Sequence, residues 1–431
     1  MDCRVDLSLD LRQNYAPVET EEKIRLLMEQ ALSDREGDGP LRDLAAGGRT
    51  REPLDPINIR SLPDRGHGPT RLFRILLTNA CSFSCDYCPM RASRVIPRHA
   101  LAPQSLADAF LTAYRRRWVS GLFVTTGIPR NPRWAMDRLI ELVEILRLRR
   151  GYAGYLHVKA VSGAEPEQVD RLVELCDRVS YNLEAACQAT LDSVAREKSF
   201  DEGLSLLERV RRRAVELGRQ RVKGDPRPEG SANAAGMTAQ FVVGIGKEAD
   251  RDFLAATHRL WRQRLLHHPH FAAFRPIEDT PLENERETPL LRENRLYQAD
   301  YLLRRYGFEP GELVYRGDGN LPLSRDPKLA WALAHPERFP VEASRADRET
   351  LLRVPGLGPK TVERLLAGRR TLARLDLAGL RRLGAACARA AGFLSWRGKT
   401  LGTREFQESL FPPEDFPEPS RVYGFSPGTF R

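Results

Sequence analysis

The alternation of apolar and amphipathic segments between residues 71 and 277 most constrains what this chain can fold into. Six short apolar runs are typical of buried strands: 72–77, 121–126, 155–161, 179–183, 238–244 and 271–276. Five amphipathic stretches separate them: 103–116, 134–149, 166–177, 200–217 and 250–265. Pro103 and Pro166 suit the first helical turn, where a missing N–H costs nothing. This order predicts a parallel sheet with right-handed crossovers, curled into a partial (β/α)6, TIM-like barrel.

Three cysteines follow the first of these strands. Cys81, Cys85 and Cys88 have the spacing C-x3-C-x2-C, whereas the other four of the seven cysteines are scattered singly. An odd count with one tight group indicates a metal site in a reducing compartment rather than a disulfide framework. The group emerges at the carboxyl end of a strand, where barrels of this kind gather their functional residues.

Soft thiolates select either zinc or an iron–sulfur cluster. A closed zinc site needs a fourth ligand, and His67 and His99 both lie outside the loop. Zinc with a distant fourth ligand and a chance grouping of cysteines stay open as alternatives. A [4Fe–4S] cluster with three cysteine ligands leaves one iron open to an amine and a carboxylate, and S-adenosylmethionine carries both. We therefore predict that the three cysteines hold such a cluster.

The cysteine motif after a first strand, with Tyr87 before its last cysteine, resembles that of the radical SAM superfamily. The resemblance implies that a reduced cluster cleaves S-adenosylmethionine to methionine and a 5′-deoxyadenosyl radical, which removes hydrogen from an unreactive C–H bond. It also implies an electron donor such as flavodoxin or ferredoxin. The cofactor carries this chemistry, and the protein supplies orientation and a dry cavity.

The resemblance assigns cofactor contacts to Tyr87 and to the end of the second strand. Thr125, Thr126 and Gly127 stand where relatives place a Gly-Gly-Glu-like stretch that contacts the methionine ammonium. The acidic residue of that stretch is absent here. Backbone carbonyls and threonine hydroxyls are therefore expected to make the contact.

The ends of the fourth and fifth strands carry the next implied contacts. Asn182 and Glu184 stand where relatives bind the ribose hydroxyls, and their i, i+2 spacing predicts that both side chains face the same side. Gly244 and Gly246 resemble the turn that contacts the adenine, since glycine lets a flat base approach the backbone.

Three further residues are weaker candidates. Lys159 on the third strand is expected to face the cavity, and Lys198 to pair with the cofactor carboxylate. For each, the alternative is an ordinary strand-end or surface residue. Cys187, just beyond the fourth strand, is a candidate hydrogen donor to a substrate radical, with a small buried cysteine as the alternative.

Residues 352–366 match the helix-hairpin-helix pattern, and 377–393 match it in part, as a degenerate second copy would. Gly356 and Gly358 predict a tight turn whose amides, with the next helix start, bind an anion such as a DNA phosphate. Pro355, Lys360 and Thr361 complete the predicted nucleic-acid-binding residues. Residues 351–400 hold eleven Lys and Arg against two acidic residues, a net +9 of the chain's +10. Helix packing, protein binding and a solvated arginine-rich surface are the alternatives.

The cluster motif, the hairpin and the segments 295–300, 326–332 and 339–341 together resemble a family of radical SAM proteins named for DNA modification and repair. The resemblance covers about residues 71–393. It implies a uracil-DNA-glycosylase-like protein as a candidate partner, because members are often encoded beside one. The leading hypothesis is a radical enzyme that repairs or modifies a base or sugar of DNA, with the target nucleotide flipped out of the duplex.

Two other function classes stay open. One is a tRNA-modifying radical enzyme, although methylthiolation is disfavoured because the chain has no second cysteine group for an auxiliary cluster. The other is an iron–sulfur protein that binds DNA or senses a signal without turnover.

The expected organisation has five parts. Residues 1–70 form a helical and irregular extension with one helix near 20–32, and 71–277 form the barrel. Residues 278–343 form a connector with helices near 292–306 and 328–334, 344–400 form the helix-hairpin-helix module, and 401–431 an irregular tail. No run of about 18 uncharged apolar residues and no apolar leader is present, so a cytoplasmic protein without a membrane span is expected.

Overall fold

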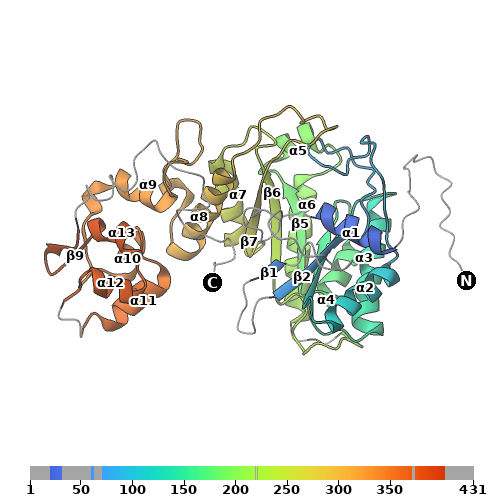
Figure 1. The fold of residues 1–431 in the computed structure, drawn as a ribbon, viewed down its shortest axis with the longest axis horizontal. Helices are drawn as coiled ribbons and strands as arrows, with labels where there is room; N and C mark the ends of the chain where they lie inside the picture. Colours follow the sequence, from blue (N-terminus) through green and yellow to red (C-terminus); the bar gives the residue numbers. More distant parts are fainter. Residues whose placement is uncertain are drawn as a thin grey trace, which may run out of the picture. The chain divides into compact units, whose positions relative to one another are not determined.

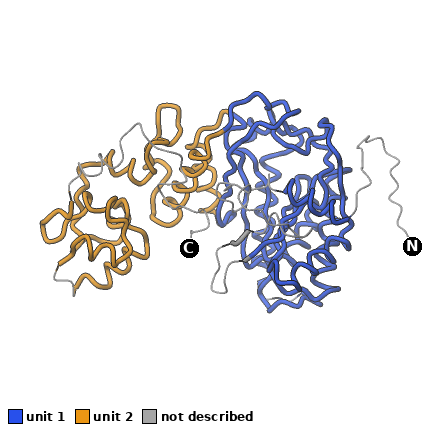
Figure 2. The backbone as a smooth tube through the Cα atoms, in the orientation of Figure 1, with its two compact units in different colours: residues 1–246, 264–287, 428–431 blue, residues 247–263, 288–427 orange. Residues whose placement is uncertain are grey.

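The computed structural model describes residues 20–31, 60–62 and 70–402, except 219, 221 and 371–373. His67 and most of the expected extension and tail lie outside these residues. The chain divides into two compact units (Figure 2). Among the described residues, unit 1 holds those up to Gly246 and Arg264–Glu287, and unit 2 holds Lys247–Gln263 and those from Thr288 onward.

Unit 1 is built on one sheet whose strands follow one another in chain order (Figure 1). The strands are β1 (Arg60–Leu62), β2 (Thr70–Leu76), β3 (Gly121–Thr125), β4 (Tyr155–Ala160), β5 (Arg178–Glu184), β6 (Met237–Val243) and β7 (His268–Ala273). Strands β2 to β7 are parallel, which confirms the six predicted strands and their order. They curl into the predicted half-barrel. The short β1, which pairs antiparallel with β2, was not predicted.

The helices of unit 1 lie before and between these strands along the chain. They are α1 (Thr20–Gln30), α2 (Pro103–Arg115), α3 (Pro132–Glu144), α4 (Pro166–Leu175), α5 (Gln188–Val194) and α6 (Phe200–Leu217). Pro103 and Pro166 stand in the first turn, as predicted. Helix α3 starts before the predicted residue 134, because Asn131 caps it by accepting a hydrogen bond from the Trp134 N–H. It continues as a π-helical turn, η2 (Ile145–Arg149).

Unit 2 consists of helices and a small sheet. The helices are α7 (Asp250–Arg262), α8 (Leu290–Tyr306), α9 (Pro327–Ala334), α10 (Arg348–Arg353), α11 (Pro359–Gly368), α12 (Leu377–Leu383) and α13 (Cys387–Ala390), with 3-10 turns η3 (Pro310–Glu312), η4 (Pro336–Arg338) and η5 (Ala391–Phe393). The sheet, which was not predicted, has the order β10 (Lys399–Thr400), β9 (Leu394–Trp396), β8 (Val341–Glu342). Helix α7 packs against α8, and the fully buried Asp250 carboxylate pairs with Arg292 at 2.7 Å. Among the helices that the structure describes, none has the length and apolar character to cross a bilayer.

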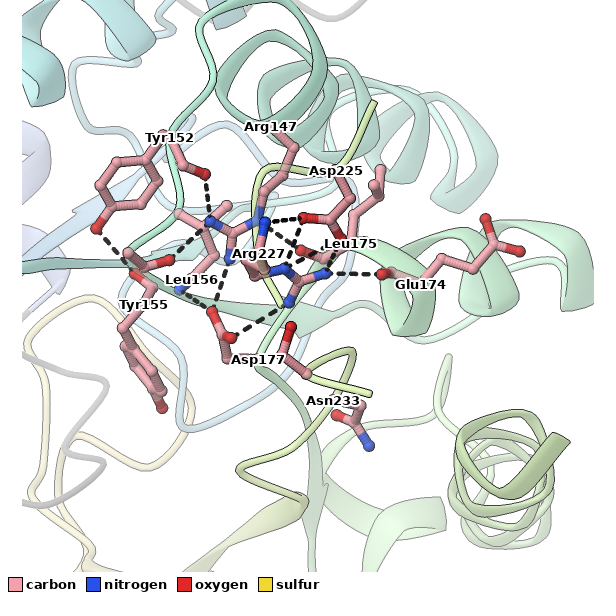
Figure 3. A network of polar contacts seen from close by, with 12 residues as sticks. Arg147, Tyr152, Tyr155, Leu156, Glu174, Leu175, Asp177, Asp225, Arg227 and Asn233 are labelled. Carbon is pink, nitrogen blue, oxygen red and sulfur yellow. Dashed lines mark hydrogen bonds and ion pairs between the residues drawn. The ribbon is translucent and has the colours of Figure 1, made fainter. Parts of the chain in front are cut away.

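A buried polar network ties the loop after α6 to the barrel, near the start of β5 (Figure 3). The Arg147 guanidinium is fully buried and donates to the carbonyls of Leu175 and Tyr152 and to the Asp177 carboxylate, at 2.6–2.9 Å. On its other side Asp177 pairs with Arg227 at 3.2 Å. Buried charges of this kind are tolerated because every one of them has hydrogen-bonding partners.

Replacing Arg147 by methionine should destabilise unit 1 strongly. The carbonyls of Leu175, Tyr152 and Gly154 would lose their donor and Asp177 would keep only part of its pairing, at a cost of about 3 kcal/mol or more. We expect the Tm in differential scanning fluorimetry to fall by roughly 10 °C. Arg150→Met is the matched control, because its ion pair with Asp108 is exposed and is expected to contribute less than about 1 kcal/mol. Equal Tm values for both variants would contradict a structural role for the network.

Candidate functional site

A cavity of about 470 Å³ lies at the carboxyl ends of the parallel strands of unit 1. Each of these strands contributes to its wall: Leu76 from β2, Thr125 from β3, Lys159 from β4, Asn182 from β5, Gln240 from β6 and Ala272 from β7. The three cysteines of the motif and Tyr87 line the same cavity. The structure thus gathers these side chains at the edge of the sheet where the sequence pattern places them.

The cysteine motif forms a loop after β2. Cys81 and Cys85 are buried and Cys88 is half-buried, with the Met90 N–H donating to the Cys88 sulfur at 3.4 Å. Burial raises the pKa of Cys85 to about 11 and that of Cys88 to about 12, while the Lys198 ammonium acts in the opposite direction on both. The two thiols are therefore protonated at neutral pH unless a metal that binds sulfur displaces the protons.

Arg98 holds the two ends of this loop together. Its guanidinium is almost fully buried and donates to the carbonyls of Asn79, Met90, Arg91 and Arg94 at 2.7–2.9 Å. Asn79 precedes the cysteines and the other three residues follow them. One buried side chain therefore sets the span of the loop, and it does so through rigid, planar donors.

The thiol arrangement fits a cluster better than a single metal ion. Within the described residues, no three side chains of His, Cys, Asp or Glu converge on a point where one ion could be held. Tetrahedral zinc requires such convergence, with sulfur ligands at about 2.3 Å. A [4Fe–4S] cluster does not, because each cysteine binds a different iron. The three thiols line one cavity wall without converging on a single point, and this arrangement fits a [4Fe–4S] cluster better than a zinc ion.

The end of β3 packs directly against the cluster loop. The Gly127 N–H donates to the Thr78 carbonyl at 2.8 Å, and the Ser82 N–H donates to the Ile128 carbonyl at 2.7 Å. A Cβ atom at Gly127 would lie 2.1 Å from the Ala80 carbonyl oxygen. Only glycine fits at position 127, because the backbones of residues 127 and 80 lie so close together. This close packing keeps residues 125–128 in the cavity wall next to the cysteines.

The end of β5 departs from regular strand geometry at Glu184. The pairing of β5 with β6 shifts between Asn182 and Glu184, and Glu184 has a φ of +62°, which is strained for a residue with a side chain. Both side chains line the cavity, as predicted, but an irregularity at the strand end places them there rather than simple i, i+2 alternation.

Lys198 pairs with Glu184 at 2.6 Å rather than standing alone for a cofactor carboxylate. Burial acts to lower the pKa of Lys198, but the Glu184 carboxylate outweighs it and the pKa is raised. Lys198 therefore stays charged at neutral pH, and both residues line the cavity.

One buried acceptor in the wall, Asn182 Oδ1, has no hydrogen-bond partner among the described residues, and beside it the Tyr87 hydroxyl interacts with the Glu184 carboxylate. An unsatisfied buried polar atom costs about 1–3 kcal/mol. Native sites keep such atoms where a ligand satisfies them. The two acceptors Asn182 and Glu184 fit the hydroxyl groups of a ribose, and the half-buried Tyr87 ring provides an apolar face beside them.

Three of the predicted site residues lie elsewhere. Gly244 and Gly246 do not line the cavity, although Gly244 has the positive φ of +96° that a turn at the end of β6 requires. Their contact with an adenine stays a prediction. Cys187 is exposed and lies outside the cavity wall, at the N-cap of α5. The alternative of a buried Cys187 is wrong, because residues 185 and 186 take the buried positions after β5, and its role as a hydrogen donor stays a prediction.

The residues predicted to bind nucleic acid lie in and after the turn between α10 and α11. Gly356 has a φ of +80°, and a Cβ there would lie 2.6 Å from the Ala386 carbonyl oxygen, so the turn needs glycine. Gly358 is the N-cap of α11, Lys360 is exposed and Pro355 is buried. Thr361 is also buried and donates to the Gly384 carbonyl at 3.1 Å, so its hydroxyl packs the hairpin instead of facing solvent.

Several cavity residues were not predicted, chiefly Phe83, Ser162, Gln240 and Arg275. Gln240 could have been found from its pattern, because it is a lone amide in the apolar run of β6. Ser162 and Arg275 directly follow β4 and β7, at the sheet edge that the other site residues share. Phe83 lies inside the cysteine motif itself.

Comparison with known proteins assigns the central part of the chain. Residues 75–219 match the family model of the Radical SAM superfamily. Among solved structures, the FeFe-hydrogenase maturase HydG is 12% identical with a TM-score of 0.42, over 66% of this chain and 62% of that one. HydG from Carboxydothermus hydrogenoformans is 13% identical with a TM-score of 0.42, over 54% of this chain and 51% of that one. Methylornithine synthase PylB is 13% identical with a TM-score of 0.42, over 68% of this chain and 72% of that one.

This chain thus spans less than two thirds of the length of both HydG proteins. No curated protein sequence matches it. The assignment rests on the family match, which includes the three cysteines and the ends of β3 to β5. Residues 75–219 therefore carry the domain of a radical SAM enzyme, a superfamily that works with a [4Fe–4S] cluster and S-adenosylmethionine.

Proposed function

We propose that this chain is a radical SAM enzyme that acts on DNA, by repair or modification of a base or sugar. When bound, the cluster and S-adenosylmethionine supply the chemistry for removing hydrogen from an unreactive C–H bond. Enzymes of this superfamily need an electron donor, for which a flavodoxin or ferredoxin is a suitable candidate. The uracil-DNA-glycosylase-like partner stays a prediction.

The cavity wall suggests how the chain would hold the cofactors. Cys81, Cys85 and Cys88 would bind the cluster. The segment from Thr125 to Gly127, which is bonded to the cysteine loop, would face the methionine ammonium. At the other side of the cofactor, Asn182 and Glu184 would accept hydrogen bonds from the ribose hydroxyls, with Tyr87 beside the nucleoside. Lys198 would hold the Glu184 side chain in place through their ion pair.

One observation on unit 2 supports DNA as the target: most of the basic side chains in residues 351–400 are exposed to solvent. Three of the eleven serve the fold, since Arg353 pairs with Glu312, Arg389 with Asp326, and Arg369 donates to the Ala346 carbonyl. The remaining eight are exposed: Lys360, Arg364, Arg370, Arg374, Arg381, Arg382, Arg397 and Lys399. A surface of this kind favours a polyanion through counterion release.

Binding of duplex DNA should weaken on Gly358→Asp and Lys360→Glu. Position 358 tolerates a side chain, because its φ is not positive and a Cβ would meet only the Tyr306 hydroxyl at 3.6 Å. Aspartate is also a good N-cap, so α11 keeps its stability while a negative charge faces the phosphate. We expect about tenfold weaker binding or more for each variant, measured by fluorescence anisotropy at several salt concentrations. Lys360→Glu should also lower the slope of log K against log salt by about 1.

Gly358→Asn is the matched control, since it caps the helix with nearly the same shape but no charge. It should bind DNA within about twofold of the unchanged protein. Equal losses for the aspartate and asparagine variants, or binding that does not depend on salt, would show that the turn only packs helices. Structured RNA, offered in the same assay, would replace DNA as the target if it bound tighter at every salt concentration.

A further inference from the structure

The end of α5 and the turn after it hold the cysteine loop on both sides of Cys85. The Ser84 N–H donates to the Glu197 carboxylate at 2.8 Å, and the Ser84 hydroxyl donates to the same oxygen. On the other side of the cysteine, the Asp86 N–H donates to the Val194 carbonyl at 2.8 Å. Cys85 therefore stands between two backbone groups that are fixed by one short segment of the chain.

The peptide groups that carry these two N–H groups are also held at their carbonyl ends. The Phe83 carbonyl accepts a hydrogen bond from the Ala92 N–H at 2.8 Å, and the Cys85 carbonyl accepts one from the Cys88 N–H at 3.2 Å. A peptide group is planar, so hydrogen bonds at both of its ends fix its orientation. With the peptide groups 83–84 and 85–86 both fixed, the backbone at Cys85 has little freedom to move.

The residue after Glu197 reaches a different part of the same cavity. Lys198 pairs with Glu184 at the irregular end of β5, and their side chains are only 15% and 4% exposed. The turn that carries both residues is closed by the Lys198 N–H, which donates to the Ala195 carbonyl at 2.8 Å. Two consecutive side chains thus hold two parts of the site, since Glu197 contacts the cysteine loop and Lys198 contacts the end of β5.

Glu197 acts on the site from outside it. Lys198 lines the cavity, whereas neither Glu197 nor Ser84 does, so a cofactor bound in the cavity would not touch the Glu197 carboxylate. Hydrogen bonds from an N–H and a hydroxyl to a carboxylate are stronger than those to a neutral acceptor. Of the two contacts beside Cys85, the one at Glu197 uses a side chain, so a substitution can remove it.

We propose that Glu197 is a positioning residue that fixes Cys85 for the cluster and, through Lys198, holds the end of β5 at a set place relative to the cysteine loop. Groups that orient a metal ligand affect binding although they do not touch the metal. S-adenosylmethionine has to meet the cysteine end and the β5 end of the cavity together, so their relative placement decides how well it binds. The role of Glu197 depends on the cofactors of the radical SAM superfamily and is independent of the DNA target.

Hydrogen exchange of the full chain without its cluster tests the contact itself. In Glu197→Leu the Ser84 N–H loses its acceptor, and we expect its exchange to become about tenfold faster. Glu197→Gln keeps an amide oxygen at the same place and should stay within about threefold of the unchanged protein. Glu208→Leu, which replaces an exposed glutamate of α6, is the matched control and should leave exchange in the cysteine loop within about twofold. Exchange at Ser84 that is unchanged in Glu197→Leu would overturn the proposal.

The reconstituted chain tests the positioning role. Anaerobic titration calorimetry, normalised to bound iron, should show S-adenosylmethionine binding about tenfold weaker in Glu197→Leu and restored in Glu197→Gln. The electron paramagnetic resonance signal of the reduced cluster should differ from that of the unchanged protein in Glu197→Leu alone of these two. A role in stability only would lower the Tm and leave both readouts unchanged for the folded protein, which would overturn the proposal.

Ser84→Ala keeps the test decisive if Glu197→Leu does not fold. It removes the hydroxyl and leaves the backbone N–H bonded to Glu197, so S-adenosylmethionine binding should weaken by about threefold. Binding equal to that of the unchanged protein, or a Glu197→Gln protein as impaired as Glu197→Leu, would overturn the proposal. None of these measurements uses DNA, so a chain that fails to bind DNA would remove the DNA target and leave these results unaffected.

Discussion

Replacing Cys85 by alanine should abolish cluster binding and with it the formation of 5′-deoxyadenosine. The thiol lies in the cavity wall with Cys81 and Cys88, and the described residues offer no further cysteine there to replace it. Loss of groups that merely support a metal ligand costs about 10- to 100-fold, so loss of the ligand itself should exceed that. Iron and sulfide content after anaerobic reconstitution, and 5′-deoxyadenosine formed with a strong reductant, measure the two effects.

Cys187→Ala is the matched control for this experiment. Cys187 is exposed and lies outside the cavity wall, so iron content and turnover should both stay within about twofold. Full iron content in Cys85→Ala would contradict the cluster assignment. A fall in turnover for Cys187→Ala at unchanged iron content would support its predicted role as a hydrogen donor.

Replacing Gly127 by alanine should displace the cluster loop without any change in its ligands. The added Cβ would lie 2.1 Å from the Ala80 carbonyl oxygen, and Ala80 is fully buried directly before Cys81. The clash is with backbone, which cannot rotate away, so relief requires a shift of the loop or of residues 125–128. We expect a destabilisation of about 1–3 kcal/mol and a loss of at least about half of the cluster iron.

Gly311→Ala serves as the control for the added methyl group. Its Cβ would meet nothing within 4 Å and its φ is not positive. Cluster content should therefore match that of the unchanged protein. Far-UV circular dichroism separates a local shift at Gly127 from global unfolding, since a local shift leaves the helical signal in place. A Gly127→Ala protein with complete cluster content and unchanged Tm would contradict the tight approach at this position.

The barrel could be predicted from the sequence because its strands are apolar runs that are buried on both faces. All residues of β3 and β6 are buried, as expected for a parallel sheet covered on both sides. The cluster motif could also be predicted, because its three cysteines lie within eight consecutive residues of the sequence. The sequence did not predict strand β1 or helix α5. With three and seven residues, these elements are too short to show a periodic pattern of apolar residues.

The rest of the site depends on contacts between segments that are far apart in sequence. Glu184 reaches the cavity through a strand-end irregularity and a pairing with Lys198, neither of which has a signal in the sequence. The same holds for Arg98, whose four carbonyl acceptors depend on the folded path of the loop. Thr361 fits the hairpin pattern, but its hydroxyl is used by a second turn at Gly384. Motif positions predicted candidate site residues, and tertiary packing decides which groups each of them contacts.

The boundary between the two units limits how the chain can be cut into separately folding fragments. Helix α7 belongs to unit 2 although the strands on either side of it in sequence, β6 and β7, belong to unit 1. A barrel fragment that ends at residue 287 would keep α7 but lose α8, and the fully buried Asp250 would lose Arg292 as its counter-ion. A fragment that begins at residue 288 would lack α7 altogether. A single cut at this boundary therefore cannot yield two intact fragments, and experiments on either unit require the full chain.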